Sequence, residues 1–278
     1  MDTTDMATAM EETTRFDDLP VSCVAHVLAL TSPRDVCRCA AVSPSATRER
    51  FVPADYLAIL LRSSSGRSPP PSSKKKAYLR LSDNAVQVGD GCDTAVWLAR
   101  GSGAKCVALS ARKLSLSWDD GEFSWRWTPH PLSRFPEVAQ LVGCTGLDIY
   151  GRLPVSALTP ATNYAAYLVF SVADVGHRGL SFPDQETTVV VGGRAASSRA
   201  VCLCLNEEEE PRKFRGVVDA DGVRRPERRD DGWSEMEMGR LRVDETVAAE
   251  EGVVVSFEVL GWYPKHGLIV EAVKFRPL

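Results

Sequence analysis

Residues 77–278 consist of short apolar runs separated by Gly, Pro, Asp and Asn, the residues that favour turns. Apolar and polar side chains alternate in "WSEMEM" (233–238) and in "VVVSFEV" (253–259), so one face of each segment meets a core. Many short strands joined by turns predict an all-β jelly-roll or β-sandwich domain with a few short helices. The candidate strands are residues 106–111, 114–118, 146–153, 164–172, 187–193, 200–205, 233–238, 252–262 and 268–277.

One segment inside this region has the spacing of a helix. In "RFPEVAQLV" (134–142), Val138, Leu141 and Val142 fall on one face at helical intervals. We expect a helix there.

The N-terminal part has a different pattern, with two short helices and a break. In "FDDLPVSCVAHVLALTS" (16–32), Pro20 suits a first helical turn, and three apolar residues recur at i, i+3 and i+4. In "SPRDVCRCAAVS" (32–43), Ser32 is placed to cap the next helix, with Pro33 at its first position and Asp35 at the third. A further short amphipathic segment covers residues 51–63.

The stretch "SSSGRSPPPSSKKK" (63–76) separates the two patterns. It holds no apolar residue, so it cannot bury surface and we expect a flexible linker. The predicted organisation is a disordered N-terminus (1–15), a small all-α region (16–61), a linker (62–76) and the β-domain (77–278).

The charge balance excludes one class of partner. With 33 basic and 37 acidic residues the net charge is −4, and Lys and Arg are spread along the chain, so we expect no nucleic-acid partner. Residues 1–15 lack the features of a secretory signal and no apolar run has the length of a membrane span, so we expect an intracellular protein without a membrane partner.

The sequence contains no clear motif for metal binding or for catalysis. The eight cysteines lie mostly in apolar stretches, and we expect buried thiols in a reducing compartment. The chain also contains no G-x-S-x-G elbow, phosphate-binding glycine loop or H-E-x-x-H, and nothing selects one of its four histidines as a catalytic base. We expect no enzyme activity, no metal and no cofactor. The candidate metal ligands are Cys23 with His26, and the pairs Cys37/Cys39 and Cys202/Cys204, but their spacings do not match those of structural zinc sites.

Several blocks of the β-domain resemble the phloem protein 2 lectins of plants, the group typified by the tobacco leaf lectin. These blocks are "LSARKLSLSWDDGEFSWRW", "SRFPEVAQLVGCTGLDIYGRLPVSALTPATNYAAYLVFSV", "RRDDGWSEMEMG" and "KHGLIVEAVKFRPL", which together span nearly all of residues 76–278. The segment "LPVSCVAHVLALTSPRDVCRCAAVS" resembles an F-box. The pairing implies a plant F-box protein with a phloem-lectin domain, a substrate receptor of SCF-type ubiquitin ligases.

The F-box resemblance implies an adaptor-binding surface. A Skp-type adaptor would bind the helices through their apolar face, with Leu-Pro at the first helix entry; the alternative is a helical hairpin that packs on its own domain. Between "AAVSPSATRER" and "FVPADY" the chain is shorter than its relatives by about three helical turns, which would weaken adaptor binding. The adaptor-binding residues implied are Leu19, Pro20, Val24, Val27, Leu28 and Pro33.

The tryptophans of "SWDDGEFSWRW" (117–127) have two interpretations. Alternation places Trp125 and Trp127 on one strand face, so ordinary core packing is one reading. The lectin resemblance implies instead that Trp118 and Trp125 stack on a sugar, which leaves Trp127 structural and requires a bend or bulge between them. In "GWSE" the resemblance adds Glu235 as a hydroxyl acceptor.

One position departs from the lectin pattern. Arg240 stands where relatives carry a second acid, which removes an acceptor and adds positive charge. Asp119, Asp120 and Glu122 lie near the tryptophans and could compensate, or they are exposed turn acids.

The resemblance therefore implies a receptor in the cytoplasm and nucleus that bridges a Skp-type adaptor and a glycoprotein or protein substrate, with a glycoprotein or glycan that contains N-acetylglucosamine as the expected partner of the β-domain. The alternatives are a free lectin for N-acetylglucosamine oligomers or N-glycans, and a stress-response scaffold with neither activity.

Overall fold

The computed structural model describes residues 53–63, 71–89, 91–100, 102–117, 124–174, 176–181, 185–203, 223–244 and 251–278. The predicted disordered N-terminus and the two predicted N-terminal helices lie outside these residues. So do all the residues expected to bind the adaptor, which are Leu19, Pro20, Val24, Val27, Leu28 and Pro33.

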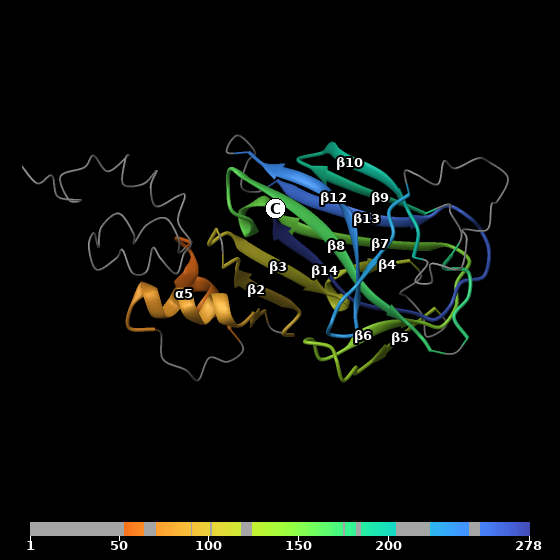
Figure 1. Ribbon diagram of the computed structural model, residues 1–278, viewed down its shortest axis with the longest axis horizontal. Helices are drawn as coiled ribbons and strands as arrows, with labels where there is room; N and C mark the ends of the chain where they lie inside the picture. The colour runs from red at the N-terminus through yellow and green to blue at the C-terminus, as the bar shows by residue number, and fades with distance from the viewer. Residues whose placement is uncertain are drawn as a thin grey trace, which may run out of the picture.

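The described residues form two antiparallel sheets packed face to face, which confirms the predicted β-sandwich (Figure 1). The larger sheet has the order β1-β2-β3-β14-β8-β12-β11, with β6 pairing with β14 and β5 pairing with β6. Its strands are β1 (Val86–Val88), β2 (Thr94–Leu98), β3 (Lys105–Ser110), β5 (Trp125–Thr128), β6 (Val138–Leu141), β8 (Thr162–Val172), β11 (Glu227–Arg228), β12 (Ser234–Val243) and β14 (Leu268–Pro277).

The smaller sheet has the order β10-β9-β13-β7-β4. Its strands are β4 (Ser115–Leu116), β7 (Leu147–Pro154), β9 (Gln185–Val191), β10 (Arg194–Val201) and β13 (Gly252–Val259). Two single-turn 3-10 helices, η2 (Ala111–Lys113) and η3 (Val155–Ala157), connect strands of the two sheets.

The core lies between the sheets and follows the alternation seen in the sequence. On β13, Val253, Val255, Phe257 and Val259 all belong to the main apolar cluster, as expected for a strand with one buried face. On β14, Val273 and Phe275 face this core, so Lys274 and Arg276 point to the outer face of the larger sheet.

Two helices pack at the β1 end of the larger sheet. Helix α4 (Tyr56–Leu61) confirms the amphipathic segment predicted at 51–63, and α5 (Lys74–Asp83) begins with Ser73, whose hydroxyl accepts from the Lys76 amide at 3.3 Å. Leu60, Tyr78 and Leu81 form a small apolar cluster with strands β1 and β2. Figure 1 shows α5 beside β2.

Helix α5 overlaps the C-terminal end of the linker predicted at 62–76. It begins at Lys74, so residues 74–76 are helical rather than linker, because a serine cap and the apolar face of the following turns stabilise the helix against the sheet. Ser63 forms a bridge with Val88, and residues 64–70 lie outside the described part. The boundaries of the predicted domains stay a prediction.

The helix predicted at 134–142 is wrong. Residues 138–141 form β6, which pairs with β5 on one side and with β14 on the other. Val138 packs beside Trp233, whereas Ala139 and Leu141 belong to the main core. A strand buried on both faces has apolar residues at intervals that also fit a helix, and the pairing with β14 decides between them.

The remaining strand predictions differ mainly in their ends. Of the predicted strand at 200–205, residues 200 and 201 are the last two of β10, residues 202 and 203 lie beyond its end, and the rest lie outside the described part. Strand β10 begins at Arg194, directly after the turn at Gly192 and Gly193. Both glycines have positive φ, +54° and +76°, which a tight hairpin turn requires.

Among the described residues, no group of three or more His, Cys, Asp and Glu is arranged to hold a metal ion. Each helix in this part of the chain is too short or too polar to cross a bilayer. Cys106 and Cys202 are buried, as expected for their apolar strands, whereas Cys92 and Cys144 are half-buried.

Candidate functional site

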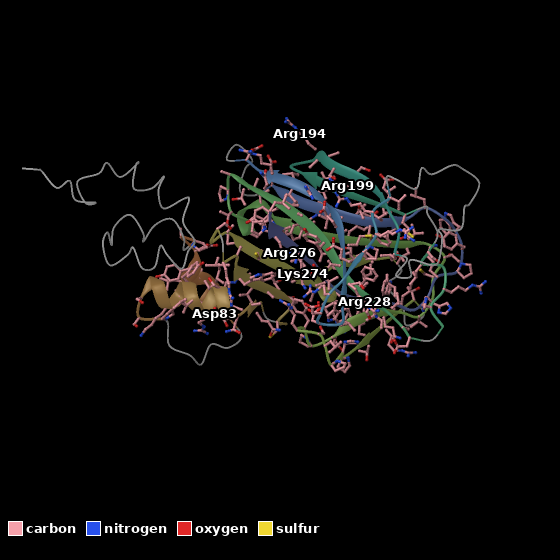
Figure 2. All side chains as sticks on the ribbon, viewed as in Figure 1. Asp83, Arg194, Arg199, Arg228, Lys274 and Arg276 are labelled. Atoms are coloured by element: carbon pink, nitrogen blue, oxygen red, sulfur yellow. The ribbon has the colours of Figure 1, made fainter. Side chains whose placement is uncertain are left out.

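A cleft of about 650 Å³ lies between the C-terminal end of α5 and the outer face of the larger sheet. We call it the Glu235 cleft, because this is the predicted site residue that the described structure places in it. Figure 2 shows Asp83 near α5 and Lys274 and Arg276 on the sheet beyond it. The residues that line it include Ser82, Asp83, Asn84, Gln87, Trp97, Arg134, Arg229, Glu235, Lys274 and Arg276.

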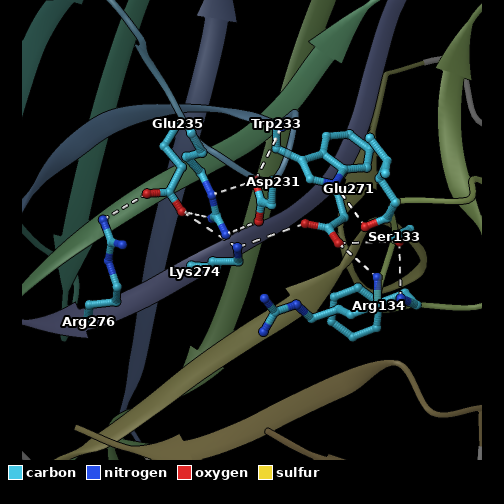
Figure 3. Close-up of polar contacts among 11 residues, drawn as sticks. Ser133, Arg134, Asp231, Trp233, Glu235, Glu271, Lys274 and Arg276 are labelled. Carbon is cyan, nitrogen blue, oxygen red and sulfur yellow. Dashed lines mark hydrogen bonds and ion pairs between the residues drawn. The ribbon is translucent and has the colours of Figure 1, made fainter. Parts of the chain in front are cut away.

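Three cations surround the carboxylate of Glu235 (Figure 3). Strand β12 turns this side chain outward, where Arg229 contacts it directly and Arg276 Nη2 lies 2.9 Å from Oε2. Lys274 Nζ is 3.5 Å from Oε1. Glu235 is only 7% exposed, so the ion pairs compensate for its loss of solvent. A sugar hydroxyl would have to compete with these cations for the carboxylate.

Arg229 is held in place by a second acid. Its guanidinium also contacts Asp231, and the turn at 229–233 places both residues before β12. Burial would raise the pKa of Asp231, but hydrogen bonds from the Arg229 side chain and the Trp233 amide, together with the charges of Arg229 and Lys274, lower it. Arg229 and Asp231 of this turn therefore form an ion pair beside Glu235.

Lys274 is the least solvated charge in the cleft. It is 2% exposed, and burial lowers its pKa from 10.5 to about 8, with Glu271 opposing this shift. Glu271 lies 3.9 Å from Nζ and accepts hydrogen bonds from the Ser133 hydroxyl and the Arg134 amide, at 3.3 and 3.1 Å. The bulge between Val270 and Ala272 shifts the alternation of β14 next to Glu271.

Two guanidinium groups stack on aromatic rings at this face. Arg134 lies over Trp97 with 5.7 Å to the ring centroid, and Arg276 lies over Tyr167 at 4.0 Å. The arrangement suits a polar ligand with a negative group, because cations and aromatic surface meet in one cleft.

Comparison with known proteins identifies the family. The phloem protein 2 family matches residues 104–277. The chain belongs to the phloem protein 2 family. It is 34% identical to F-box protein PP2-B10 of Arabidopsis thaliana over 96% of this chain and 95% of that protein. It is 33% identical to F-box protein PP2-B15 over 93% of this chain and 96% of that protein, also from Arabidopsis thaliana.

Among solved structures, a family 35 carbohydrate-binding module from Clostridium thermocellum aligns with 61% of this chain and 96% of its own length. The identity is 11% and the TM-score 0.32. This likeness is too low to carry an argument, and the two-sheet fold of this phloem protein 2 chain rests on the strand pairing given above.

The tryptophans of the phloem protein 2 domain differ from the expectation for a sugar site. Trp125 is 3% exposed, belongs to the main core, and its indole N–H donates to the Ser117 carbonyl at 2.8 Å. This arrangement offers no free ring face to a sugar, because the strand face that carries Trp125 is the one that closes the core. Trp118 lies outside the described residues, as do Asp119, Asp120 and Glu122.

The bend expected between Trp125 and Trp127 is absent. Strand β5 pairs regularly with β6, so both indoles point to the same side, and Trp127 is half-buried against the core. Arg112 covers the Trp127 ring at 3.8 Å from its centroid. Between these two residues, Trp127 is thus the one nearer the surface.

Arg240 is paired rather than free. Its Nε and Nη2 lie 3.0 and 3.1 Å from the two carboxylate oxygens of Glu237, which also pairs with Arg199 and Arg224. Burial would raise the pKa of Glu237, but these arginines, Arg240 first, lower it. Arg240 is therefore exposed but occupied by an ion pair with Glu237 of the same strand.

Trp262 is an exposed aromatic that the sequence patterns did not single out. It is 79% exposed on the loop between β13 and β14. The fully buried Lys265 anchors this loop, with Nζ donating to the carbonyls of Thr145, Gly261 and Tyr263 at 2.7, 2.6 and 3.0 Å. The run "GWYPK" carries no periodic signal, so only the structure reveals this ring.

Proposed function

We propose that this protein is a substrate receptor of an SCF-type E3 ubiquitin ligase. Residues 16–61 would bind a Skp-type adaptor, and the β-sandwich would recruit a glycoprotein or protein that other subunits ubiquitinate. The observation that carries the proposal is the similarity to F-box protein PP2-B10, which covers 96% of this chain. An alignment of that length must include most of residues 16–61 as well as the β-domain. The receptor bridges two partners and performs no catalysis.

The packing of α4 supports a receptor whose two parts are joined firmly. This helix belongs to the region predicted to bind the adaptor, yet Leu60 packs with α5 and the sandwich. Asp55 pairs with the buried Lys105 of β3 at 3.2 Å. A fixed joint would present the bound substrate to the ligase in a defined orientation.

Co-expression with a plant Skp-type adaptor and size-exclusion chromatography test this proposal. We expect a one-to-one complex that Leu19→Ala and Pro20→Ala abolish, because both residues lie at the proposed entry of the first helix. Leu79→Ala, an exposed position on α5, is the matched control and should keep the complex. Separate elution of the folded chain and the adaptor would refute the proposal.

A second candidate function is a free lectin, favoured by the Glu235 cleft. In that case N-acetylglucosamine oligomers or N-glycans bind, and Trp118→Ala or Glu235→Gln should remove binding to chitin oligomers. A glycan array with the full chain measures this. Glycan binding without any adaptor complex would select the lectin, and absence of both would select a scaffold.

A further inference from the structure

The Glu235 cleft carries more positive than negative charge. Its walls include four cations, Arg134, Arg229, Lys274 and Arg276, against Glu235 and Asp83. Asp83 is itself paired with Arg100 at 3.3 Å. Even with Asp231 and Glu271 added from behind the wall, the pairing of Asp83 leaves one cation of the cleft in excess.

Arg134 supplies this excess charge. Within the described part of the chain its guanidinium forms no ion pair, and it lies over Trp97 at the exposed rim of the cleft. Its backbone amide is bound to Glu271, which fixes the base of the side chain. A guanidinium anchored in this way can offer its parallel N–H groups to an incoming carboxylate or phosphate.

Lys274 lacks close hydrogen-bond acceptors. Its ammonium is almost fully buried, and its nearest carboxylates are 3.5 and 3.9 Å away, in contrast to Lys265, which has three carbonyls within 3.0 Å. The hydroxyl of Ser82, also in the cleft wall, is buried and has no hydrogen-bond partner in the described structure. A buried hydroxyl without a partner is costly, and a ligand oxygen would satisfy Ser82 and add a closer partner to the two long ion pairs of Lys274.

We propose that the Glu235 cleft binds an acidic sugar through its carboxylate or phosphate group, with Arg134 and Lys274 as the principal donors. The inference rests on the proposed function of the β-domain as a ligand-binding domain and names the ligand class. Glu235 occupies the cations when the cleft is empty and competes with the anionic ligand for them.

Other features of the cleft fit a sugar better than an extended peptide. Its volume of about 650 Å³ suits a ligand of one or two sugar rings. The Asn84 side-chain amide lies in the wall and can pair with hydroxyls. The Gln87 amide nitrogen already donates to the Arg134 carbonyl, which leaves its carboxamide oxygen as an acceptor, and the half-buried Trp97 beneath Arg134 adds apolar ring surface to the wall.

Isothermal titration calorimetry of the full chain tests the inference with four probes. These are digalacturonic acid, glucose 6-phosphate, the neutral disaccharide chitobiose in its N-acetylated form, and a phosphoserine peptide. We expect an acidic sugar to bind more tightly than the neutral disaccharide, with an affinity that falls as NaCl is raised. The first two probes distinguish a carboxylate from a phosphate as the recognised group.

Arg134→Gln is the decisive variant. It removes one unpaired cation from the rim, so the fold is preserved and the affinity for the acidic sugar should fall about tenfold or more. Arg126→Gln, which removes an exposed arginine on β5 outside the cleft, should leave the affinity unchanged. Equal binding by wild type and Arg134→Gln would overturn the inference.

Glu235→Gln should change the affinity for the acidic sugar in the opposite direction to Arg134→Gln. If Glu235 competes with the ligand, the variant should bind the acidic sugar several-fold more tightly; weaker binding by folded Glu235→Gln overturns the inference. Tighter binding of the phosphopeptide than of either acidic sugar also overturns it. The adaptor complex reports separately on the proposed function, because it depends on residues 16–61 and not on the cleft.

Discussion

Trp125 is held by packing and by one hydrogen bond, so its main contribution is to stability. Trp125→Ala should lower the free energy of unfolding by about 3 to 5 kcal/mol, as for other large-to-small changes in a core. Trp125→Phe, which loses the bond to the Ser117 carbonyl but fills much of the space, should cost about 1 to 3 kcal/mol. Urea denaturation measures both. If folded Trp125→Phe lost glycan binding, the residue would have a ligand role that its burial does not suggest.

Lys274 should make stability depend on pH above neutrality. Because its pKa is about 8 in the folded chain and 10.5 when exposed, the unfolded chain binds more protons between these values. Stability from this group therefore rises with pH across this range, by up to about 3 kcal/mol. The charged groups that face it are Glu271, Arg134, Arg229 and Glu235.

The measurement is the difference in unfolding free energy between wild type and Lys274→Met at pH 7, 8, 9 and 10. Wild type should gain on the variant as pH rises, and taking the difference cancels the contributions of Cys106 and Cys144, whose pKa values burial raises to about 12 and about 11. Lys76→Met, which removes an exposed lysine outside the cleft, is the matched control. A difference independent of pH would contradict a buried ammonium at position 274.

At the scale of elements, the docking of α5 shapes the cleft. Leu81 is fully buried against the sheet, and Ser82, Asp83 and Asn84, which follow it, form one wall of the Glu235 cleft. Leu81→Ala should lower stability by about 2 to 5 kcal/mol and increase amide exchange in α5. Leu79→Ala, on the exposed side of the same helix, should change stability little. Equal effects of the two changes would mean that α5 does not depend on this contact.

The sequence predicts strands with one buried face more reliably than strands that are short or buried on both faces. Alternation identified β12 and β13 because a strand with one buried face repeats every two residues. The same approach failed for β6, where both faces are buried, and missed β1 and β2, which are short and close to helix α5. Local pattern reports how many faces of an element are covered, but not what covers them.

At the scale of the whole molecule, the candidate site is assembled from distant parts of the chain. The cleft combines the end of α5, strand β2, the segment around Arg134, the turn before β12 and strand β14. Strand β14 is the central strand of the larger sheet, so the C-terminal residues bring Lys274 and Arg276 beside Glu235. The sequence could suggest Glu235 through the family resemblance, but not the three cations that surround it.

The sequence by itself determined the sandwich class, the family and the position of Glu235 on a strand, because alternation and motif order are local properties of the chain. The tertiary structure decided that β6 is a strand, that Trp125 is enclosed, and that Arg240 pairs with Glu237. It also decided which charges meet in the Glu235 cleft. The pairing of β6, the enclosure of Trp125 and the charges of the cleft depend on contacts between residues far apart in the chain, and such contacts form only when the two sheets close over their core. Arg240 and Glu237 are only three residues apart, but Glu237 is also held by Arg199 of the other sheet.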